Sequence, residues 1–99
     1  MNASFGGSTA MYTESEAIRL APEILFVVSA GNKAYDLDVR PQYPACYGWD
    51  NILVVASVGK NGNLSDFSNY GGPAAIAAPG EAIYSTFPGN SFLNMDGTS

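Results

Sequence analysis

The segment EILFVVSAG, residues 23–31, is almost continuously apolar and ends in a glycine, and NILVVASVG at residues 51–59 repeats that pattern. Runs of β-branched and large apolar residues without polar alternation are typical of strands covered on both faces of a parallel sheet. AAIAAPG (74–80) is predicted to be a third strand, stopped by its Pro-Gly pair, and MNASFGG (1–7) is a candidate fourth. These segments predict an α/β protein built on a parallel sheet.

A helix is predicted over ESEAIRLA, residues 14–21. Thr13 and Glu16 have the spacing of a capping box, and Pro22 ends the apolar stripe of the segment. The order strand, helix, strand then predicts a right-handed crossover between parallel strands. Further along, KNGN (60–63) contains an Asn-Gly pair, which is a strong signal for a tight turn.

Composition and charge exclude several classes of partner. The chain has 99 residues, 46% of them apolar and 13% charged, which fits one small globular domain. A net charge of −5 with only four Lys and Arg residues provides no basic patch for nucleic acid or an anionic membrane. No apolar run is long enough to cross a bilayer, and no secretory signal is visible. The single cysteine, Cys46, is expected to be a small buried residue.

Seven short motifs follow one another along the chain: SFGG (4–7), VVSAGN (27–32), YPACY (43–47), FSNYG (67–71), AAPG (77–80), IYST (83–86) and DGTS (96–99). Their order and approximate spacing resemble those of the subtilisin-like serine proteases, the subtilases, over nearly the whole chain. The resemblance implies a parallel-sheet subtilisin-like fold, of which residues 1–99 form part of a three-layer α/β/α domain. It also implies a serine endopeptidase that cleaves peptide bonds through an acyl-enzyme intermediate.

The resemblance implies specific roles for residues of these motifs. Ser99 is the expected nucleophile, and the Asn32 amide and the Ser99 backbone N–H are the expected donors to the developing oxyanion. The expected substrate-binding residues are Ser4, Phe5, Gly6, Gly7, Ser29, Ala30, Gly31, Gln42, Gly97 and Thr98. Ser4–Gly7 and Ser29–Gly31 should end two adjacent strands and leave backbone groups free to pair with an extended peptide. Gln42 falls at the base of the family's specificity pocket, where an uncharged residue suits neither a strongly acidic nor a strongly basic side chain. The resemblance further implies a cis bond between Tyr43 and Pro44.

Histidine is absent from the 99 residues, so the expected base of a catalytic triad is missing. In subtilases the triad Asp and His precede the segment present here, and a central helix follows the serine. We therefore expect a partial peptidase domain, inactive by itself, in a longer extracellular or cell-surface enzyme. No cofactor is expected. A structural calcium ion could belong to the longer protein, but Asp36 and Asp38 are more simply explained as a solvated loop. A non-catalytic α/β ligand-binding or decayed protease-like module remains the alternative.

Overall fold

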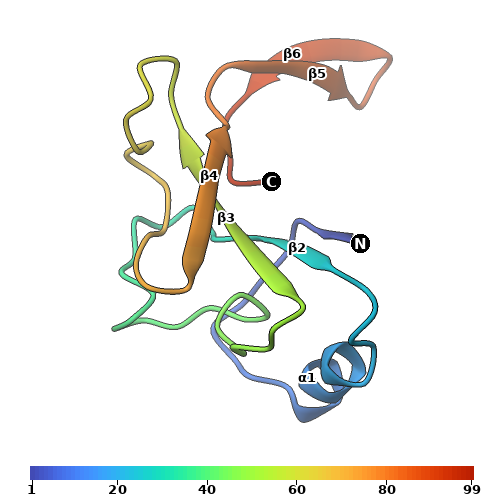
Figure 1. The fold of residues 1–99 in the computed structure, drawn as a ribbon. Helices are drawn as coiled ribbons and strands as arrows, with labels where there is room; N and C mark the ends of the chain where they lie inside the picture. The colour runs from blue at the N-terminus through green and yellow to red at the C-terminus, as the bar shows by residue number, and fades with distance from the viewer.

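Four short strands form one parallel sheet in the computed structural model, which describes residues 1–99. They are β1 (Asn2–Ala3), β2 (Phe26–Ser29), β3 (Ile52–Val58) and β4 (Ala74–Pro79), and they are hydrogen-bonded in that order. Figure 1 labels β2, β3 and β4 of this sheet. Phe26 pairs with Ile52 and Ser29 with Val55, and the flanking strand pairs are parallel too. The predicted parallel sheet is confirmed. The carboxyl ends of its strands therefore meet at one edge.

The hydrophobic core lies against one face of this sheet. Phe26, Val28 and Ala30 alternate along β2 and just beyond it, and all three are buried together with Val54 and Ala56 of β3. Ile18 of the helix and two loop residues, Leu37 and Ala45, complete the cluster with Ala3. The strands were predicted to be covered on both faces, but all of β4 beyond its first residue is exposed. The single helix contributes to the core on one face of the sheet, and no helix covers the other face.

Helix α1 spans Tyr12–Arg19, which is earlier than the predicted 14–21. The capping box is wrong: Thr13 lies inside the helix, and the N-cap residue is Met11, whose side chain makes no capping bond. A residue distant in sequence binds the N-cap instead, because the backbone N–H of Met11 donates to the Tyr47 hydroxyl at 2.9 Å. The helix begins where this tertiary contact places it rather than where the local motif would.

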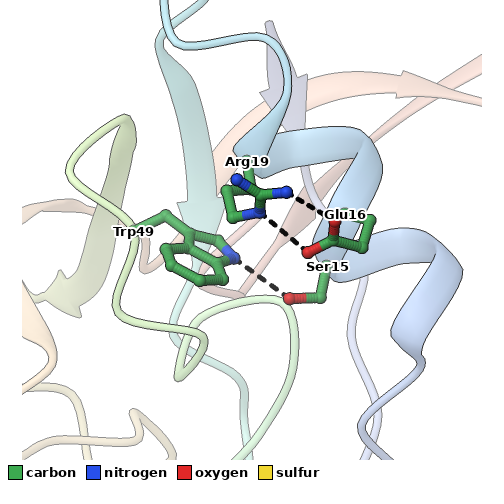
Figure 2. Close-up of polar contacts among 4 residues, drawn as sticks. All are labelled: Ser15, Glu16, Arg19 and Trp49. Atoms are coloured by element: carbon green, nitrogen blue, oxygen red, sulfur yellow. Dashed lines mark hydrogen bonds and ion pairs between the residues drawn. The ribbon is translucent and has the colours of Figure 1, made fainter.

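Polar side chains hold α1 to the loop that precedes β3. Figure 2 shows the Glu16 carboxylate accepting two hydrogen bonds from the Arg19 guanidinium, at 2.8 and 2.7 Å, instead of reaching back to a capping position. The Trp49 indole donates to the Ser15 hydroxyl at 3.0 Å, and Arg19 lies over the Trp49 ring. Asn51 then donates its side-chain amide to the carbonyls of Ile18, in the last turn of α1, and of Ala21, just beyond it. Trp49 and Asn51 thus hold the helix to the loop that precedes β3.

The chain after β3 contains one predicted turn and one element that was not predicted. The KNGN turn is present, with Gly62 at φ +78° and an antiparallel bridge between Val58 and Leu64. An antiparallel hairpin then follows β4, formed by β5 (Ile83–Phe87) and β6 (Ser91–Met95) and standing apart from the sheet in Figure 1. The only helix has eight residues, so no helix here has the length and apolar character needed to span a membrane.

Candidate active site

A cleft of about 320 Å³ opens at the carboxyl ends of β1 and β2. It brings together residues that are far apart in sequence: the Ser4–Gly7 segment, the Ser29–Asn32 segment, Gln42 and the last two residues of the chain. All the predicted site residues line this cleft except Gly97, which borders the neighbouring cavities with Ser99. The parallel sheet creates this convergence because it delivers several strand ends to one edge.

The Asn32 side chain is held by Thr98. Its Oδ1 atom accepts hydrogen bonds from the backbone N–H and from the hydroxyl of Thr98, both at 2.8 Å. The Thr98 hydroxyl in turn accepts the backbone N–H of Gly31 at 3.0 Å. A backbone N–H can only donate, so its partner on Asn32 must be the oxygen. The Thr98 N–H therefore fixes the orientation of the Asn32 amide. The Nδ2 group of Asn32 is directed away from Thr98 and has no hydrogen-bond acceptor in the protein.

Two hydrogen-bond donors border one small space beside Gly97. A methyl group built on Gly97 would lie 3.5 Å from the Asn32 Nδ2 atom and 3.7 Å from the backbone nitrogen of Ser99. Glycine leaves that space open. Two N–H donors around one open position are the arrangement that stabilises a tetrahedral oxyanion.

The Ser99 segment is fixed to the sheet from two directions. Gly97 donates its backbone N–H to the carbonyl of Gly80, directly after β4, at 2.9 Å. A Cβ atom on Gly80 would overlap the Ser57 hydroxyl and the Gly97 carbonyl oxygen, so this approach requires glycine. On the other side, the Ser4 hydroxyl donates to the Ser99 carbonyl at 3.0 Å. Figure 1 shows the result, with the C-terminus lying beside the end of β4.

Backbone groups free to pair with a peptide were predicted at the ends of β1 and β2. They are present after β1, but at the end of β2 most are already hydrogen-bonded. The backbone groups of Ser4, Phe5 and Gly6 make no hydrogen bond within the protein, and all three residues are exposed. Gly7 is different, because it exchanges two backbone hydrogen bonds with Tyr43. The Gly31 N–H and carbonyl are also occupied, by Thr98 and by the backbone of Asn69. The backbone is therefore free to pair with a peptide at residues 4–6, but not at Gly7 or Gly31.

The far wall of the cleft is built from the loop around Gln42. The Tyr43–Pro44 peptide bond is cis, as the resemblance implied. The Gln42 side chain is folded back onto the Pro41 carbonyl at 3.0 Å, and the Gln42 backbone N–H donates to the Cys46 sulfur. Cys46 is half-buried rather than fully buried, and this burial raises the pKa of its thiol. Its proton is retained at neutral pH, which fits a packing role.

Comparison with known proteins identifies the family of this chain. The Subtilase family matches residues 1–99. The chain belongs to the subtilase family. Thermitase from Thermoactinomyces vulgaris is 38% identical to this subtilase chain over 98 residues, which are 97% of the chain and 33% of Thermitase. Subtilisin-like protease 2 of Plasmodium falciparum is 43% identical over 76 residues, 76% of the chain and 6% of that protein.

A solved structure supports the fold. The crystal structure of a cold adapted subtilisin-like serine proteinase superposes with a TM-score of 0.84 at 27% identity, covering 98% of this chain and 34% of that one. The partial subtilisin-like fold predicted from the motifs is therefore confirmed. This subtilase chain spans about a third of the length of Thermitase, 33%, and 36% of Subtilisin DY from Bacillus licheniformis.

The two acidic residues considered for calcium are engaged within the subtilase chain itself. Asp36 accepts the backbone N–H of Asp38 at 3.0 Å, and Asp38 accepts that of Gly72 at 2.8 Å. The first bond is local to the loop after Asn32, and the second holds that loop against the segment that leads into β4. No cluster of three or more His, Cys, Asp or Glu side chains forms in the structure.

One site residue was missed in the sequence. Asn69 belongs to the FSNYG motif, which supported the resemblance, but no role was assigned to it. In the structure it is buried and lines the cleft beside Asn32. The available signal was an asparagine between two apolar strands of a compact chain, which does not distinguish a turn residue from a buried one.

Proposed function

We propose that Ser99 supplies the nucleophile of a serine endopeptidase, and that the Asn32 amide and the Ser99 backbone N–H supply its oxyanion hole. The observation that carries the proposal is the space beside Gly97, which is bordered by the Asn32 Nδ2 and Ser99 backbone N–H donors. Ser99 lies in the same cleft as the exposed backbone of Ser4–Gly6. Nucleophile, donors and peptide-pairing edge are thus within one cavity.

The reaction follows from these positions. The Ser99 hydroxyl loses its proton to a base as its oxygen attacks the scissile carbonyl, and the carbonyl oxygen takes on negative charge between the two donors. The C–N bond then breaks, the protonated amine leaves, and water releases the acyl group by the same steps. An imidazole is the usual base near neutral pH, and these 99 residues contain no histidine. The base and the carboxylate that orients it are proposed to come from other parts of the enzyme.

The proposed substrate is a peptide or protein segment in extended conformation. The unpaired backbone of Ser4–Gly6 supports pairing with it in the manner of an added strand. Gln42 and the Ser29–Gly31 segment would surround one substrate side chain, and the uncharged Gln42 supports a preference for neither strongly acidic nor strongly basic residues. The expected location, extracellular or at the cell surface, rests on the family alone. No cofactor enters the proposed chemistry.

A covalent probe tests the nucleophile directly. The longer polypeptide that contains these residues is treated with a fluorophosphonate, which reacts with base-activated serines, and the labelled peptide is mapped. We expect label on Ser99, and both label and peptide hydrolysis lost in Ser99→Ala. Ser91→Ala, which alters a serine on β6, is the matched control and should behave as wild type. Label on another serine, or hydrolysis that survives in Ser99→Ala, would refute the proposal.

A further inference from the structure

The turn that carries Asn32 has no internal hydrogen bonds. It leaves β2 at Gly31, with φ +105°, and passes Ala34, an alanine held at φ +53°. A non-glycine residue in this left-handed region is strained by about 1–2 kcal/mol. Such a turn does not keep its shape through its own backbone, so other parts of the chain must hold it in place.

One buried side chain makes three of the hydrogen bonds that hold the turn, beside the bond from the Ala34 N–H to the Phe67 carbonyl. The Asn69 Oδ1 atom accepts the backbone N–H groups of Lys33 at 3.1 Å and Tyr35 at 2.9 Å. The Asn69 Nδ2 atom donates to the Ala30 carbonyl at 2.8 Å. Its backbone N–H donates to the Gly31 carbonyl at 2.9 Å, and only 1% of the residue is exposed. These contacts lie on both sides of Asn32 in the sequence without touching Asn32 itself.

The shape of the turn is matched to this side chain. A Cβ atom on Gly31 would overlap the Asn69 Nδ2 atom, so the amide lies in the space that the glycine leaves free. An amide is also the neutral group that can accept two N–H bonds at one atom and donate to a carbonyl from another. Aspartate could accept the same N–H groups, but it would face the Ala30 carbonyl without a proton to donate.

We propose that Asn69 is a positioning residue for oxyanion stabilisation, acting through Asn32. Thr98 fixes the Asn32 amide from the Ser99 side, and Asn69 fixes the backbone from which that amide projects. The inference rests on the proposed role of Asn32 as an oxyanion donor. Without Asn69 the turn would relax, and the Nδ2 donor would move relative to the Ser99 N–H. A displacement of about 1 Å at a catalytic group can reduce the rate 10²-fold.

A double-mutant cycle in the active longer enzyme tests this inference. Asn69→Ala is expected to lower kcat about 10- to 100-fold with little change in KM, because the oxyanion forms only as the reaction proceeds. In an Asn32→Ala background the same change should lower kcat less than about threefold, since the donor that Asn69 positions is already gone. Equal losses in both backgrounds, or an unchanged kcat in folded Asn69→Ala enzyme, would overturn the inference.

Two further variants separate positioning from general stability. Asn51→Ala removes another asparagine amide that binds backbone carbonyls, at the helix end remote from the cleft, and should lower stability with kcat unchanged. Should Asn69→Ala fail to fold, Asn69→Asp keeps the two accepting contacts, and an intermediate kcat is expected. A wild-type kcat in Asn69→Asp would overturn the positioning role. If Asn32→Ala alone retained the wild-type kcat, the proposed function of Asn32 would fail, and this inference with it.

Discussion

The proposed oxyanion hole of this subtilase requires a residue without a β-carbon at position 97. A β-carbon there would stand at ordinary van der Waals distance from Asn32 Nδ2 and from the Ser99 nitrogen, so it would fit without distorting the fold. It would nevertheless occupy the position between the two donors. At Gly80, by contrast, a β-carbon would overlap the Gly97 carbonyl oxygen and the Ser57 hydroxyl. Gly97 and Gly80 therefore serve different needs: Gly97 leaves room for the proposed oxyanion, and Gly80 allows two backbone segments to pack closely.

Gly97→Ala should separate catalysis from stability. We expect the variant of the longer enzyme to keep its melting temperature within a few degrees and to lose kcat by at least about tenfold, because one donor can no longer reach the oxyanion. Gly80→Ala is the comparison and should instead lose about 1–3 kcal/mol of unfolding free energy through overpacking. Thermal melts and steady-state kinetics measure both effects. A fully active Gly97→Ala enzyme would contradict the proposed position of the oxyanion.

At the scale of elements, the strands of the parallel sheet were predictable and the helix ends were not. The segments at 23–31 and 51–59 have apolar residues on both faces, and in the structure they contain the strands β2 and β3. The start of α1 depends on Tyr47, which no local pattern near residue 12 could indicate. The β5–β6 hairpin was missed because its strands are largely exposed and carry no continuous apolar run. Its Pro88–Asn90 turn, with Gly89 and Asn90 at positive φ, was the signal that could have found it.

The candidate site, like the fold, was only partly predictable from the sequence. Ser99 and Asn32 were identified from motifs whose spacing resembles a known family, and the structure brings both into one cleft. Thr98 was among the predicted site residues, but neither its contact with Asn32 nor any role for Asn69 could be identified in this way. Asn69 acts through contacts with residues more than thirty positions away, and the pairing of Gly7 with Tyr43 is equally remote. Roles that depend on long-range packing have no local sequence signature.

Tyr47→Phe tests the contact that sets the start of α1. The Tyr47 hydroxyl accepts the Met11 N–H and donates to Glu14 at 2.7 Å. Burial and the Glu14 carboxylate both raise the pKa of Tyr47, so the hydroxyl stays protonated. Loss of this hydroxyl should lower the unfolding free energy by about 0.5–1.5 kcal/mol in urea titrations. Tyr84→Phe, on the exposed hairpin, is the matched control and should change little. Equal stability in Tyr47→Phe and wild type would mean that the contact does not anchor the helix.

At the scale of the whole molecule, much apolar surface faces solvent. Ile83, Phe87 and Leu93 of the hairpin and Ile76 of β4 each expose 43% or more of their surface. Tyr84 and Phe92 stack on each other across the two hairpin strands. Exposed apolar patches and open sheet edges are sites of association between protein surfaces. Thermitase is about three times as long as this chain, which covers 33% of it.

The 99-residue chain by itself should hydrolyse no peptide. Proton transfer from Ser99 needs a group with a pKa near neutrality, and the chain has no histidine to provide one. The measurement is release of a chromogenic leaving group from peptide substrates by the purified chain, with the longer enzyme as the positive control. Hydrolysis by the chain that disappears in Ser99→Ala would show that a different base activates the serine.

The role of Asn32 as an oxyanion donor is tested most directly by the turnover of Asn32→Ala in the longer enzyme. We expect KM for a chromogenic peptide to be nearly unchanged while kcat falls about 10²- to 10³-fold, the loss known for an oxyanion donor in subtilisin itself rather than a magnitude calculated from this structure. Asn94→Ala, on the exposed strand β6, controls for the loss of an asparagine and should keep the wild-type rate. A wild-type kcat in Asn32→Ala would show that Asn32 is a turn residue and that the oxyanion forms elsewhere.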